Sequence, residues 1–460
     1  MPKQPNIMIV HCHDLGQYLH CYGVPTVQTP NIDHLAGEGV RFTRMYATAS
    51  MCSPSRGSLL TGQYPARNGL IGLCGKDYRW ELTDPTRHLS HVLRRSGYHT
   101  ALFGYQHETH DPKTLGFDDL TCADFPNPRS WGNSMPADQR ASDVAAFLKS
   151  ETARKRPFYL QFGTMEAHTP YDWKACPPDS EKGTWIPPYC LVDTSDPEAD
   201  KLKRHIAGLQ GSLHRLDCAV GIVLDALRDS GLEDNTIVLF SSDHGPELPR
   251  AKWTTYDAAT RIGFLMRWPA AGLSGGRDCD VLLSNIDFVP TLADWLNLDL
   301  NHDLDGRSFA QALQADNPPA DAVRDTVYGD FIYNLTYGMR TLTHSLSMNF
   351  RGWYSGRDAG TVPFLEVFDL TRDPYEQVSI ADHPERADTC ARLERQFWQH
   401  LKDTNDPVLK GDYGTPPYVG NEPGEYVEPC EQHRRALQRC GSRKDRSDPS
   451  DRTDRTDSER

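Results

Sequence analysis

The sequence lacks any apolar run long enough to cross a membrane. Its longest apolar segments, NTIVLFSS and IGFLMRWP, have the length of a strand and fall far short of the roughly 20 residues that a spanning helix needs. The sequence also lacks Cys-x-x-Cys pairs, because its twelve cysteines are scattered over 460 residues. This scatter predicts mostly free thiols and not the disulfide framework of a short secreted domain.

A signal peptide and an excess of positive charge are also missing. The first residues, MPKQPNIMIVH, hold one lysine and an apolar stretch too short for the core of a signal peptide, so we expect a cytoplasmic protein. The 49 lysines and arginines are outnumbered by 63 aspartates and glutamates, for a net charge of -14. This balance argues against nucleic acid or a membrane as partner, although a locally basic pocket could hold a small anion. The sequence leaves open whether the chain forms a homodimer.

The first 320 residues alternate between strand and helix signals. Strands are predicted at NIMIVHC, YHTALFG, PFYLQFG and NTIVLFSS, separated by amphipathic segments with proline starts and glycine ends. The alternation indicates a catalytic α/β domain over residues 1–320, with a large mixed, mostly parallel sheet sandwiched by helices. Residues 321–425 are predicted to form a smaller α+β subdomain with an antiparallel sheet and a helix. The charged, low-complexity residues 426–460 are predicted to be disordered.

Acidic and histidine residues follow four of the predicted strands. The segments HCHDLG, GYQHETHD, TMEAHTP and SSDHG supply Asp14, His107, His168 and Asp243. Each residue alone is compatible with an ordinary loop, and Asp14 with a turn cap before Gly16. Because the carboxyl ends of parallel strands share one sheet edge, the four together favour a metal-assisted active site.

Asp14 and Asp243 are candidate metal ligands, and His244 directly follows the second of them. Carboxylate oxygens suit Ca²⁺ or Mg²⁺, and a mixture of carboxylate and imidazole also suits Mn²⁺ or Zn²⁺. An Asp-His pair directly after a buried strand is poorly explained by packing, so it is the more specific signal.

The segment MCSPSRGSLLTG predicts a short helix over residues 53–61, because Pro54 suits a first turn and Gly62 a helix end. Cys52 would lie at the positive N-terminus, where free amides and the helix dipole stabilise a thiolate or another oxyanion. Arg56 lies within the first turn and can reach back with its planar fork. The residues alone leave open whether Cys52 is a nucleophile or a small buried side chain.

The stretch CSPSRGSLLTG resembles the signature of the sulfatases, C-x-P-S-R-x-x-x-L-T-G, at all seven specified positions. Further segments follow in the order that this family has them, among them PNIMIVHCHDLG, HLSHVLRRSGYHTALFG, SSDHG and VFDLTRDPYEQ. The resemblance covers nearly the whole chain and implies an alkaline-phosphatase-like fold. The segments CSPSRGSLLTG and RNGLIGL, with the C-terminal DPYEQ region, are most similar to heparan N-sulfatases, or sulfamidases.

The resemblance implies that Cys52 is a precursor. In sulfatases a maturing enzyme oxidises this cysteine to formylglycine, whose hydrated aldehyde supplies the nucleophilic oxygen. The family's pattern makes Asp14, Asp243 and His244 the metal site beside the modified Cys52, with Ca²⁺ as the expected ion. Arg56 would orient the formylglycine.

The same resemblance gives roles to three more residues. His107 matches the histidine of the family's G-K-x-H element and would take a proton as the enzyme-bound sulfate ester breaks down. His168 matches the H-x-P histidine and would contact the sulfate and protonate the leaving group. Lys252, nine positions after Asp243, would clamp the sulfate in the transition state.

Two positions depart from the family pattern. His13 replaces the first metal-binding aspartate, so either Ca²⁺ has fewer carboxylate ligands or a softer ion, Mn²⁺ or Zn²⁺, is used. His13 could also hydrogen-bond beside the site, or ligate together with His11. Tyr105 replaces the lysine of G-K-x-H, which removes one sulfate-stabilising cation. Tyr105 could donate a hydrogen bond there, or Gln106 could fill the role.

The expected function is a formylglycine-dependent, metal-assisted hydrolase that releases inorganic sulfate from a sulfated sugar, O- or N-linked, through a covalent sulfo-enzyme intermediate. The first alternative is a phosphonate or phosphate monoester hydrolase of the same superfamily, since those enzymes also vary at the position of Tyr105. The second alternative is a protein that binds a metal or an anion without turnover and keeps Cys52 as a thiol.

Overall fold

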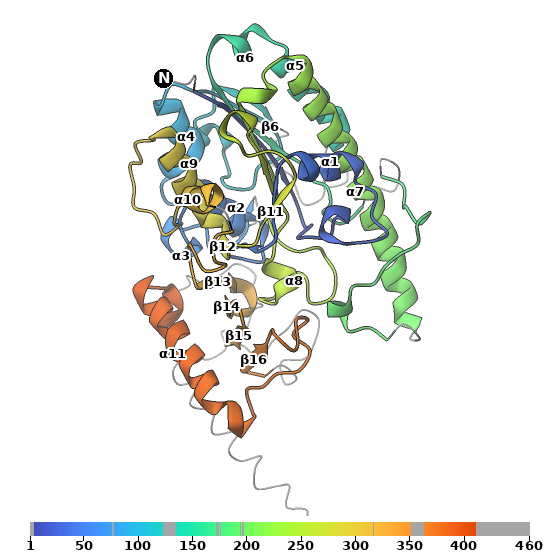
Figure 1. Cartoon of the computed structure of the whole chain (residues 1–460), viewed down its shortest axis with the longest axis vertical. Helices are drawn as coiled ribbons and strands as arrows, with labels where there is room; N and C mark the ends of the chain where they lie inside the picture. Colours follow the sequence, from blue (N-terminus) through green and yellow to red (C-terminus); the bar gives the residue numbers. More distant parts are fainter. Residues whose placement is uncertain are drawn as a thin grey trace, which may run out of the picture.

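The computed structural model describes residues 4–75, 78–122, 135–171, 174, 176–193, 195, 197–315, 317–350 and 363–410. These residues form a large domain around one sheet and a smaller C-terminal subdomain, which lies below the large domain in Figure 1. The α/β architecture predicted from the sequence is confirmed. The predicted subdomain end at residue 425 and the predicted disordered tail, residues 426–460, lie outside the described residues.

The main sheet has eight strands within the described residues, in the order β11-β2-β10-β9-β1-β8-β6-β7. They are β1 (Asn6–Cys12), β2 (Val40–Phe42), β6 (His99–Gly104), β7 (Asp119–Cys122), β8 (Phe158–Gly163), β9 (Thr236–Ser242), β10 (Phe264–Arg267) and β11 (Arg277–Cys279). The central strand β1 pairs in parallel with β8 and β9, and β10 runs antiparallel to both of its neighbours. Cys12 lies opposite Ser242, so the carboxyl ends of β1 and β9 are side by side.

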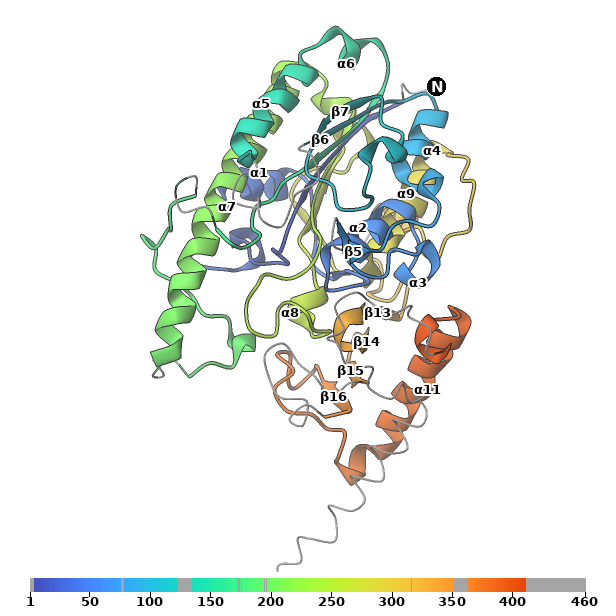
Figure 2. The ribbon, with the colours of Figure 1, turned by 180° about the vertical axis from the view of Figure 1, so that it is seen from behind.

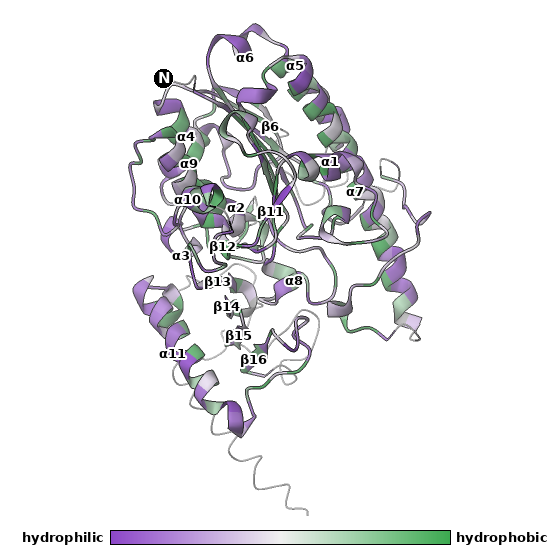
Figure 3. Cartoon of the chain, in the orientation of Figure 1, coloured by the Kyte–Doolittle hydropathy of each residue, from purple (hydrophilic) through white to green (hydrophobic). Residues whose placement is uncertain are grey.

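Helices cover both faces of this sheet, as Figures 1 and 2 show from opposite sides. One face carries α1 (Pro30–Glu38), α5 (Ala137–Leu148), α6 (Glu151–Lys155) and α7 (Pro197–Asp229). The other face carries α2 (Cys52–Thr61), α4 (Leu89–Arg95), α9 (Phe288–Leu296) and α10 (Ala310–Gln314). Apolar and polar residues alternate along α5 and α7 in Figure 3, as amphipathic surface helices require. No helix in the described ranges combines the length and apolar composition of a membrane span.

The side chains of β1 alternate between two hydrophobic cores. Val10 belongs to the core under α5 and α7, and Ile9 to the core under α2 and α4. Because strand side chains alternate with a period of two, the same pattern directs His11 and then His13 toward the α2 side. In β9 it directs Asp243, just past the strand end, to that side as well. The sheet thus aims its polar strand ends at α2.

Short elements connect these layers. They are the pairs β3 (Met45–Tyr46) with β12 (Leu283–Ser284) and β4 (Cys74–Gly75) with β5 (Tyr78–Arg79), and the helices α3 (Pro65–Asn68) and α8 (Asp257–Thr260). The nine cysteines whose side chains are described are free thiols, in agreement with the sequence prediction.

The C-terminal subdomain has an antiparallel sheet and a helix, as predicted. Its elements are β13 (Thr326–Phe331), β14 (Thr336–Thr341), β15 (His344–Asn349), β16 (Leu365–Asp369) and α11 (Ala387–Asp403). Phe397 and Leu401 of α11 are buried in a separate core with Tyr337 and Met339 of β14. This third core explains why the subdomain is distinct from the large domain.

Candidate active site

Helix α2 begins at Cys52, one residue earlier than predicted, and all ten of its residues are buried. Gly62 ends it in the left-handed conformation, with φ of 70°, and donates its N–H to the Ser58 carbonyl. Glycine adopts this backbone conformation without steric cost, which explains the sharp helix end. The first turn of α2 faces the carboxyl ends of β1 and β9.

Cys52 contacts one residue from each of these strand ends. Its Sγ lies 3.4 Å from His244 Nε2 and 3.9 Å from Asp14 Oδ1. Burial, together with the charges of Asp243 and Asp14, raises the pKa of the Cys52 thiol well above its usual value. Burial and the two carboxylates therefore favour the neutral thiol at Cys52.

Four buried side chains form a group that could hold a cation: His13, Asp14, Cys52 and Asp243 each offer one ligand atom, and these atoms lie within 4.8 Å of one another. His13 Nδ1 is 3.0 Å from Asp243 Oδ2. Burial lowers the pKa of His13 to about 3, so its ring is neutral. A buried neutral imidazole that faces carboxylates fits a metal ligand.

His244 lies beside this group and completes its surroundings. Its Nδ1 is 2.9 Å from the Gly245 carbonyl, which can only accept a hydrogen bond, so Nδ1 carries the proton. The Nε2 lone pair of His244 therefore faces Asp14 Oδ1 at 3.2 Å. Two lone pairs at that distance need a proton or a cation between them, and backbone-held histidines of this kind are common in metal sites.

Asp14 and Asp243 are also tied to each other through the backbone. Asp14 has a left-handed backbone with φ of 48°, and its N–H donates to Asp243 Oδ1 at 3.0 Å. The His244 N–H donates to the same oxygen at 2.8 Å. These bonds fix the orientation of the Asp243 carboxylate between the two strand ends.

Each carboxylate has its own buried cation. Arg56 Nε lies 3.3 Å from Asp243 Oδ2, and Nη2 donates to the Cys12 carbonyl at 3.2 Å. Lys252 Nζ lies 2.6 Å from Asp14 Oδ2 and 3.2 Å from Glu247 Oε2. Arg56 therefore positions a candidate metal ligand, and Lys252 joins Asp14 to Glu247.

These cations decide the ionisation of the carboxylates. Burial alone would raise the pKa of Asp243, but the charge of Arg56 is among the influences that hold it well below its usual value. Burial would likewise raise the pKa of Asp14, but the charge of Lys252 is among the influences that hold it below its usual value. Both carboxylates are therefore charged and able to bind a cation at neutral pH.

Aromatic rings wall the other side of the group. The His13 ring centroid lies 4.7 Å from Tyr105, 5.6 Å from His168 and 6.1 Å from His107. His168 Nε2 is 3.8 Å from Asp14 Oδ2. Burial lowers the pKa of both His107 and His168. The structure thus brings the three strand-end histidines and Tyr105 to one place.

Gln106 does not face the cation-binding group, so it is not placed to replace the lysine that is missing at Tyr105. Its Oε1 accepts the N–H groups of Glu108 at 2.8 Å and Thr109 at 3.1 Å, and its Nε2 donates to the Thr109 carbonyl at 2.8 Å. The side chain braces its own loop, which argues against Gln106 as the replacement for the missing lysine. His11 is also buried but is outside the cation-binding group of the described residues, so joint ligation with His13 is not the arrangement found.

Sequence reasoning missed four residues that support the site. Ser55 donates to the Asp243 carbonyl at 2.6 Å, and Asn285 donates to the Ser55 carbonyl at 3.0 Å. Glu247 accepts from Lys252, and the buried Glu108 accepts the His107 N–H at 2.9 Å. Ser55, Glu108 and Glu247 stand within three positions of residues that were singled out, and Ser55 is also a specified position of the CSPSRGSLLTG match; these are the signals that could have found them.

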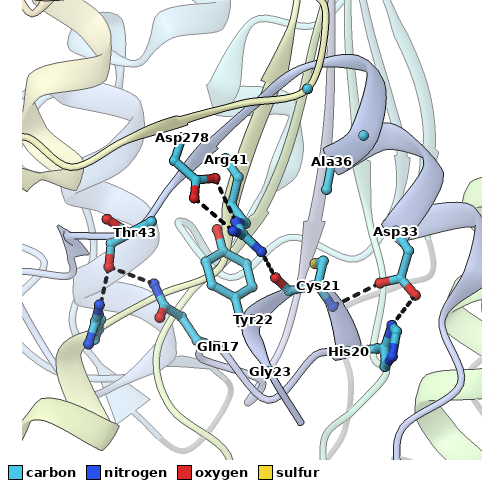
Figure 4. Close-up of a pocket in the computed structure, with 13 residues that line it drawn as sticks. Gln17, His20, Cys21, Tyr22, Gly23, Asp33, Ala36, Arg41, Thr43 and Asp278 are labelled. Carbon is cyan, nitrogen blue, oxygen red and sulfur yellow. Dashed lines mark hydrogen bonds and ion pairs between the residues drawn. The ribbon is translucent and has the colours of Figure 1, made fainter. Parts of the chain in front are cut away.

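A separate hollow of about 760 Å³ lies beside α1 and is drawn in Figure 4. Its charged side chains are already paired: Arg41 Nη2 lies 2.8 Å from Asp278 Oδ2, and His20 Nδ1 lies 2.9 Å from Asp33 Oδ2. None of the predicted site residues is among those that line it. The hollow is therefore not the candidate active site.

Comparisons with known proteins match both parts of the chain. The family model described as Sulfatase matches residues 5–298, and the one described as N-sulphoglucosamine sulphohydrolase, C-terminal, matches residues 251–403. The human N-sulphoglucosamine sulphohydrolase is 25% identical over 87% of this chain and 91% of its own length. An ulvan-active sulfatase of Formosa agariphila is 26% identical over 88% of this chain and 76% of its own length.

Solved structures share the fold. A protein in complex with its substrate D-glucosamine-2-N,6-O-disulfate has a TM-score of 0.70 and 20% identity, covering 91% of this chain and 100% of that chain. The phosphonate monoester hydrolase of Agrobacterium radiobacter has a TM-score of 0.66 and 21% identity, covering 88% of this chain and 97% of that chain.

Proposed function

Because this chain belongs to the sulfatase family and is a sulfatase, we propose that it works through a formylglycine made from Cys52 and a bound divalent cation. We further propose that its substrate is a sulfated amino sugar, as an O-sulfate or an N-sulfate. The reaction releases inorganic sulfate and the desulfated sugar.

The observation that carries the proposal is the position of Cys52. It occupies the buried first turn of α2 and shares the cation-binding group with Asp14 and Asp243. Arg56 and Lys252 supply two positive charges against those carboxylates. A nucleophilic oxygen on residue 52 would therefore stand among a cation, two basic side chains and several histidines, which suits attack on the sulfur of an anionic sulfate ester or sulfamate.

The roles of the chain's own residues follow from this geometry. Formylglycine would supply the nucleophilic oxygen, and a cation held by His13, Asp14 and Asp243 would neutralise the sulfate oxygens. His168 lies beside Asp14, whose charge opposes the effect of burial and favours the protonated ring, and it would give a proton to the departing sugar oxygen or nitrogen. His107 would take a proton when the sulfate is released, and burial keeps its ring neutral for that task. Lys252 would hold the sulfate and Arg56 would orient residue 52.

The ligand set supports a transition metal more than Ca²⁺, which the sequence alone favoured. His13 offers a ring nitrogen 3.0 Å from Asp243 Oδ2 within the cation-binding group. Imidazole is a poor Ca²⁺ ligand and a good ligand for Mn²⁺ or Zn²⁺. Elemental analysis and calorimetric titration of the purified protein test the identity. Tighter binding of Ca²⁺ than of Mn²⁺ by the unmodified ligand set would overturn this choice.

The proposal of an amino-sugar substrate rests on the similar proteins. The human N-sulphoglucosamine sulphohydrolase matches most of the chain, and its C-terminal family model matches residues 251–403 here. The solved structure with D-glucosamine-2-N,6-O-disulfate shares the fold. Release of sulfate from defined N- and O-sulfated glucosamines measures the preference directly. Turnover of sulfated galactans with none of sulfated glucosamines would overturn the sugar class.

The mass of the peptide that contains residue 52 tests the central claim. The protein is expressed with a formylglycine-generating enzyme, its proposed maturation partner, and we expect a peptide that has lost sulfur and gained an aldehyde. Cys52→Ala should retain metal binding and lose turnover. The matched control Cys390→Ala, at a buried cysteine of the separate C-terminal core, should retain turnover. Turnover by a protein with an unmodified thiol at residue 52 would refute the formylglycine mechanism, and a thiol without turnover would favour a non-catalytic binder.

A phosphonate or phosphate monoester hydrolase is a second candidate. Tyr105 favours it, because the lysine of the family pattern is missing and the phosphonate monoester hydrolase of Agrobacterium radiobacter shares this fold. The ratio of kcat/KM on an aryl sulfate and on an aryl phosphonate monoester decides between the two. A higher value on the phosphonate would replace sulfate as the proposed substrate.

A further inference from the structure

A second group of potential metal ligands lies outside the cation-binding group. Cys74 belongs to β4, Glu81 follows β5, and His110 lies in the loop that follows β6. One ligand atom from each lies within 4.8 Å of the others. His110 Nδ1 is 2.8 Å from Glu81 Oε1 and 3.6 Å from Cys74 Sγ. Two chain segments nearly thirty residues apart thus bring together a sulfur, a nitrogen and an oxygen.

The orientation of His110 selects which ring nitrogen faces the group. Its Nε2 lies 2.7 Å from the Gly75 carbonyl, which can only accept, so Nε2 carries a proton. In the neutral ring the Nδ1 lone pair then points at a carboxylate oxygen and a sulfur. Metal-ligating histidines commonly donate their other N–H to a backbone carbonyl in this way. Either a second proton on the His110 ring or a metal ion between Nδ1, the carboxylate oxygen and the sulfur would make these close contacts favourable.

The spacing of the sulfur and the nitrogen suits a tetrahedral ion. Bond lengths of about 2.3 Å from zinc to sulfur and about 2.0 Å from zinc to nitrogen separate the two ligand atoms by about 3.5 Å. The observed separation of Cys74 Sγ and His110 Nδ1 is 3.6 Å. The Cys74 side chain is buried, whereas Glu81 is 44% exposed and His110 35% exposed, so an ion could enter from solvent.

We propose that Cys74, Glu81 and His110 form a Zn²⁺ site, separate from the cation-binding group at Cys52, with solvent as the fourth ligand. Thiolate, imidazole and carboxylate together are the ligand types that zinc accepts, and Ca²⁺ or Mg²⁺ avoids sulfur. Glu81 is already oriented, because its Oε1 accepts the His110 N–H at 2.8 Å and the Thr109 hydroxyl at 3.0 Å.

The site is linked to the active site through the backbone of Cys74. The Cys74 N–H donates to Ser53 Oγ at 3.0 Å, next to Cys52, and the Cys74 backbone is hydrogen-bonded to the His107 ring. Zinc on the Cys74 side chain would therefore hold the peptide that positions His107. The proposal concerns binding and does not depend on turnover.

Equilibrium dialysis with Zn²⁺ counts the sites on the full chain. We expect two zinc ions per wild-type chain, one per chain for His110→Asn, and two for the control His91→Asn. His91 also contacts a backbone carbonyl, at 2.8 Å from Thr114, but is not part of either group of potential ligands. Equal zinc content in wild type and His110→Asn would overturn the site and leave a protonated His110 paired with Glu81.

Cobalt substitution identifies the sulfur. In a Cys52→Ser chain, which removes the thiol of the other group, Co²⁺ should give a thiolate-to-metal charge-transfer band, and Cys52→Ser/Cys74→Ser should lose it. A band that survives the loss of Cys74 would refute the ligand assignment. Glu81→Gln, at a half-exposed side chain, serves if the cysteine variant does not fold, and should weaken zinc binding about tenfold to a hundredfold. Unchanged zinc affinity in Glu81→Gln would count against the site.

Discussion

The rings of His13 and Tyr105 meet edge to face, with their centroids 4.7 Å apart and their planes at 69°. These are the two positions that depart from the sulfatase pattern, one in place of an aspartate and one in place of a lysine. One negative and one positive charge are thus missing from two side chains in contact, and the summed charge of the site is unchanged. The two departures are best understood as one paired substitution.

The paired substitution predicts strong coupling between the two positions. His13→Asp alone adds a carboxylate beside Tyr105 with no new cation, and Tyr105→Lys alone adds an ammonium beside a neutral ring. We expect each single change to lower kcat/KM by about tenfold to a hundredfold and the double change to recover most of that loss. A double-mutant cycle on an aryl sulfate measures the coupling, and strictly additive losses would contradict it.

Arg56 is predicted to be a stability determinant as well as a site residue. Its side chain is fully buried and pairs with Asp243, so Arg56→Ala should leave an uncompensated carboxylate and lower the free energy of unfolding by about 3–5 kcal/mol. Arg56→Lys keeps the charge and should cost less. The control Arg67→Ala breaks an ion pair with Asp305 at a half-exposed side chain and should cost at most about 1 kcal/mol. Urea unfolding checks all three, and equal losses at both arginines would be the contrary result.

Lys252 is predicted to oppose metal binding while it supports turnover. Its Nζ lies 2.6 Å from Asp14 Oδ2, so it repels a second cation at that carboxylate. Lys252→Met should bind Mn²⁺ about tenfold more tightly in calorimetric titration and should turn over sulfate esters at least about a hundredfold more slowly. The control Lys113→Met, at an exposed lysine, should change neither quantity. Weaker metal binding in Lys252→Met would show that the lysine organises the ligands.

Asp406 is predicted to make the wild-type protein less stable as pH rises. Burial raises its pKa from 3.8 to about 6, although the Val408 N–H donates to its Oδ1 at 2.9 Å. The folded state therefore keeps a proton that the unfolded state has lost, and stability falls between about pH 4 and pH 6.

Asp406→Asn removes that penalty and keeps an acceptor for Val408. The variant should be more stable than wild type by up to about 3 kcal/mol at pH 8, and the difference should shrink toward zero near pH 4. The buried Asp330 faces the same position and its pKa is also raised by burial and by Asp406, so the change should ease its ionisation too. Urea unfolding at several pH values, with the exposed Asp388→Asn as control, measures the difference. A difference that does not vary with pH would contradict the assignment.

Local sequence patterns predicted the helices and strands well where clear start and stop residues, such as proline and glycine, flank them. The expected helix over 53–61 is observed as Cys52–Thr61, and the strand before Asp243 ends at Ser242. The amphipathic segment predicted between the strands YHTALFG and PFYLQFG holds two helices where its pattern, ASDVAAFLKSE, suggests one. Its helix α5 ends at Leu148, and Ser150 caps α6 by accepting the Ala153 N–H at 3.3 Å. A serine cap inside an amphipathic run looks like an ordinary polar position.

The site was predictable to the extent that its residues sit at strand ends. Asp14 and Asp243 could be paired from topology alone, because parallel strands end at one edge. Ser55 and Asn285 could not, since they meet only when α2 and a distant segment pack together. The role of Gln106 depended on its rotamer, which sequence does not encode. The raised pKa of Cys52 likewise depends on its burial and on the carboxylates around it, which only the folded chain determines.

The complete burial of α2 determines whether maturation at Cys52 has to precede folding. Cys52 is 3% exposed, and no residue of α2 is open to solvent. A maturing enzyme that must grip this segment could reach it only before the sheet and its helices close around it. If Cys52 is converted as proposed, maturation competes with folding. A chain that folds before its Cys52 is converted stays inactive for as long as it stays folded. Slower folding would then raise the fraction of active molecules.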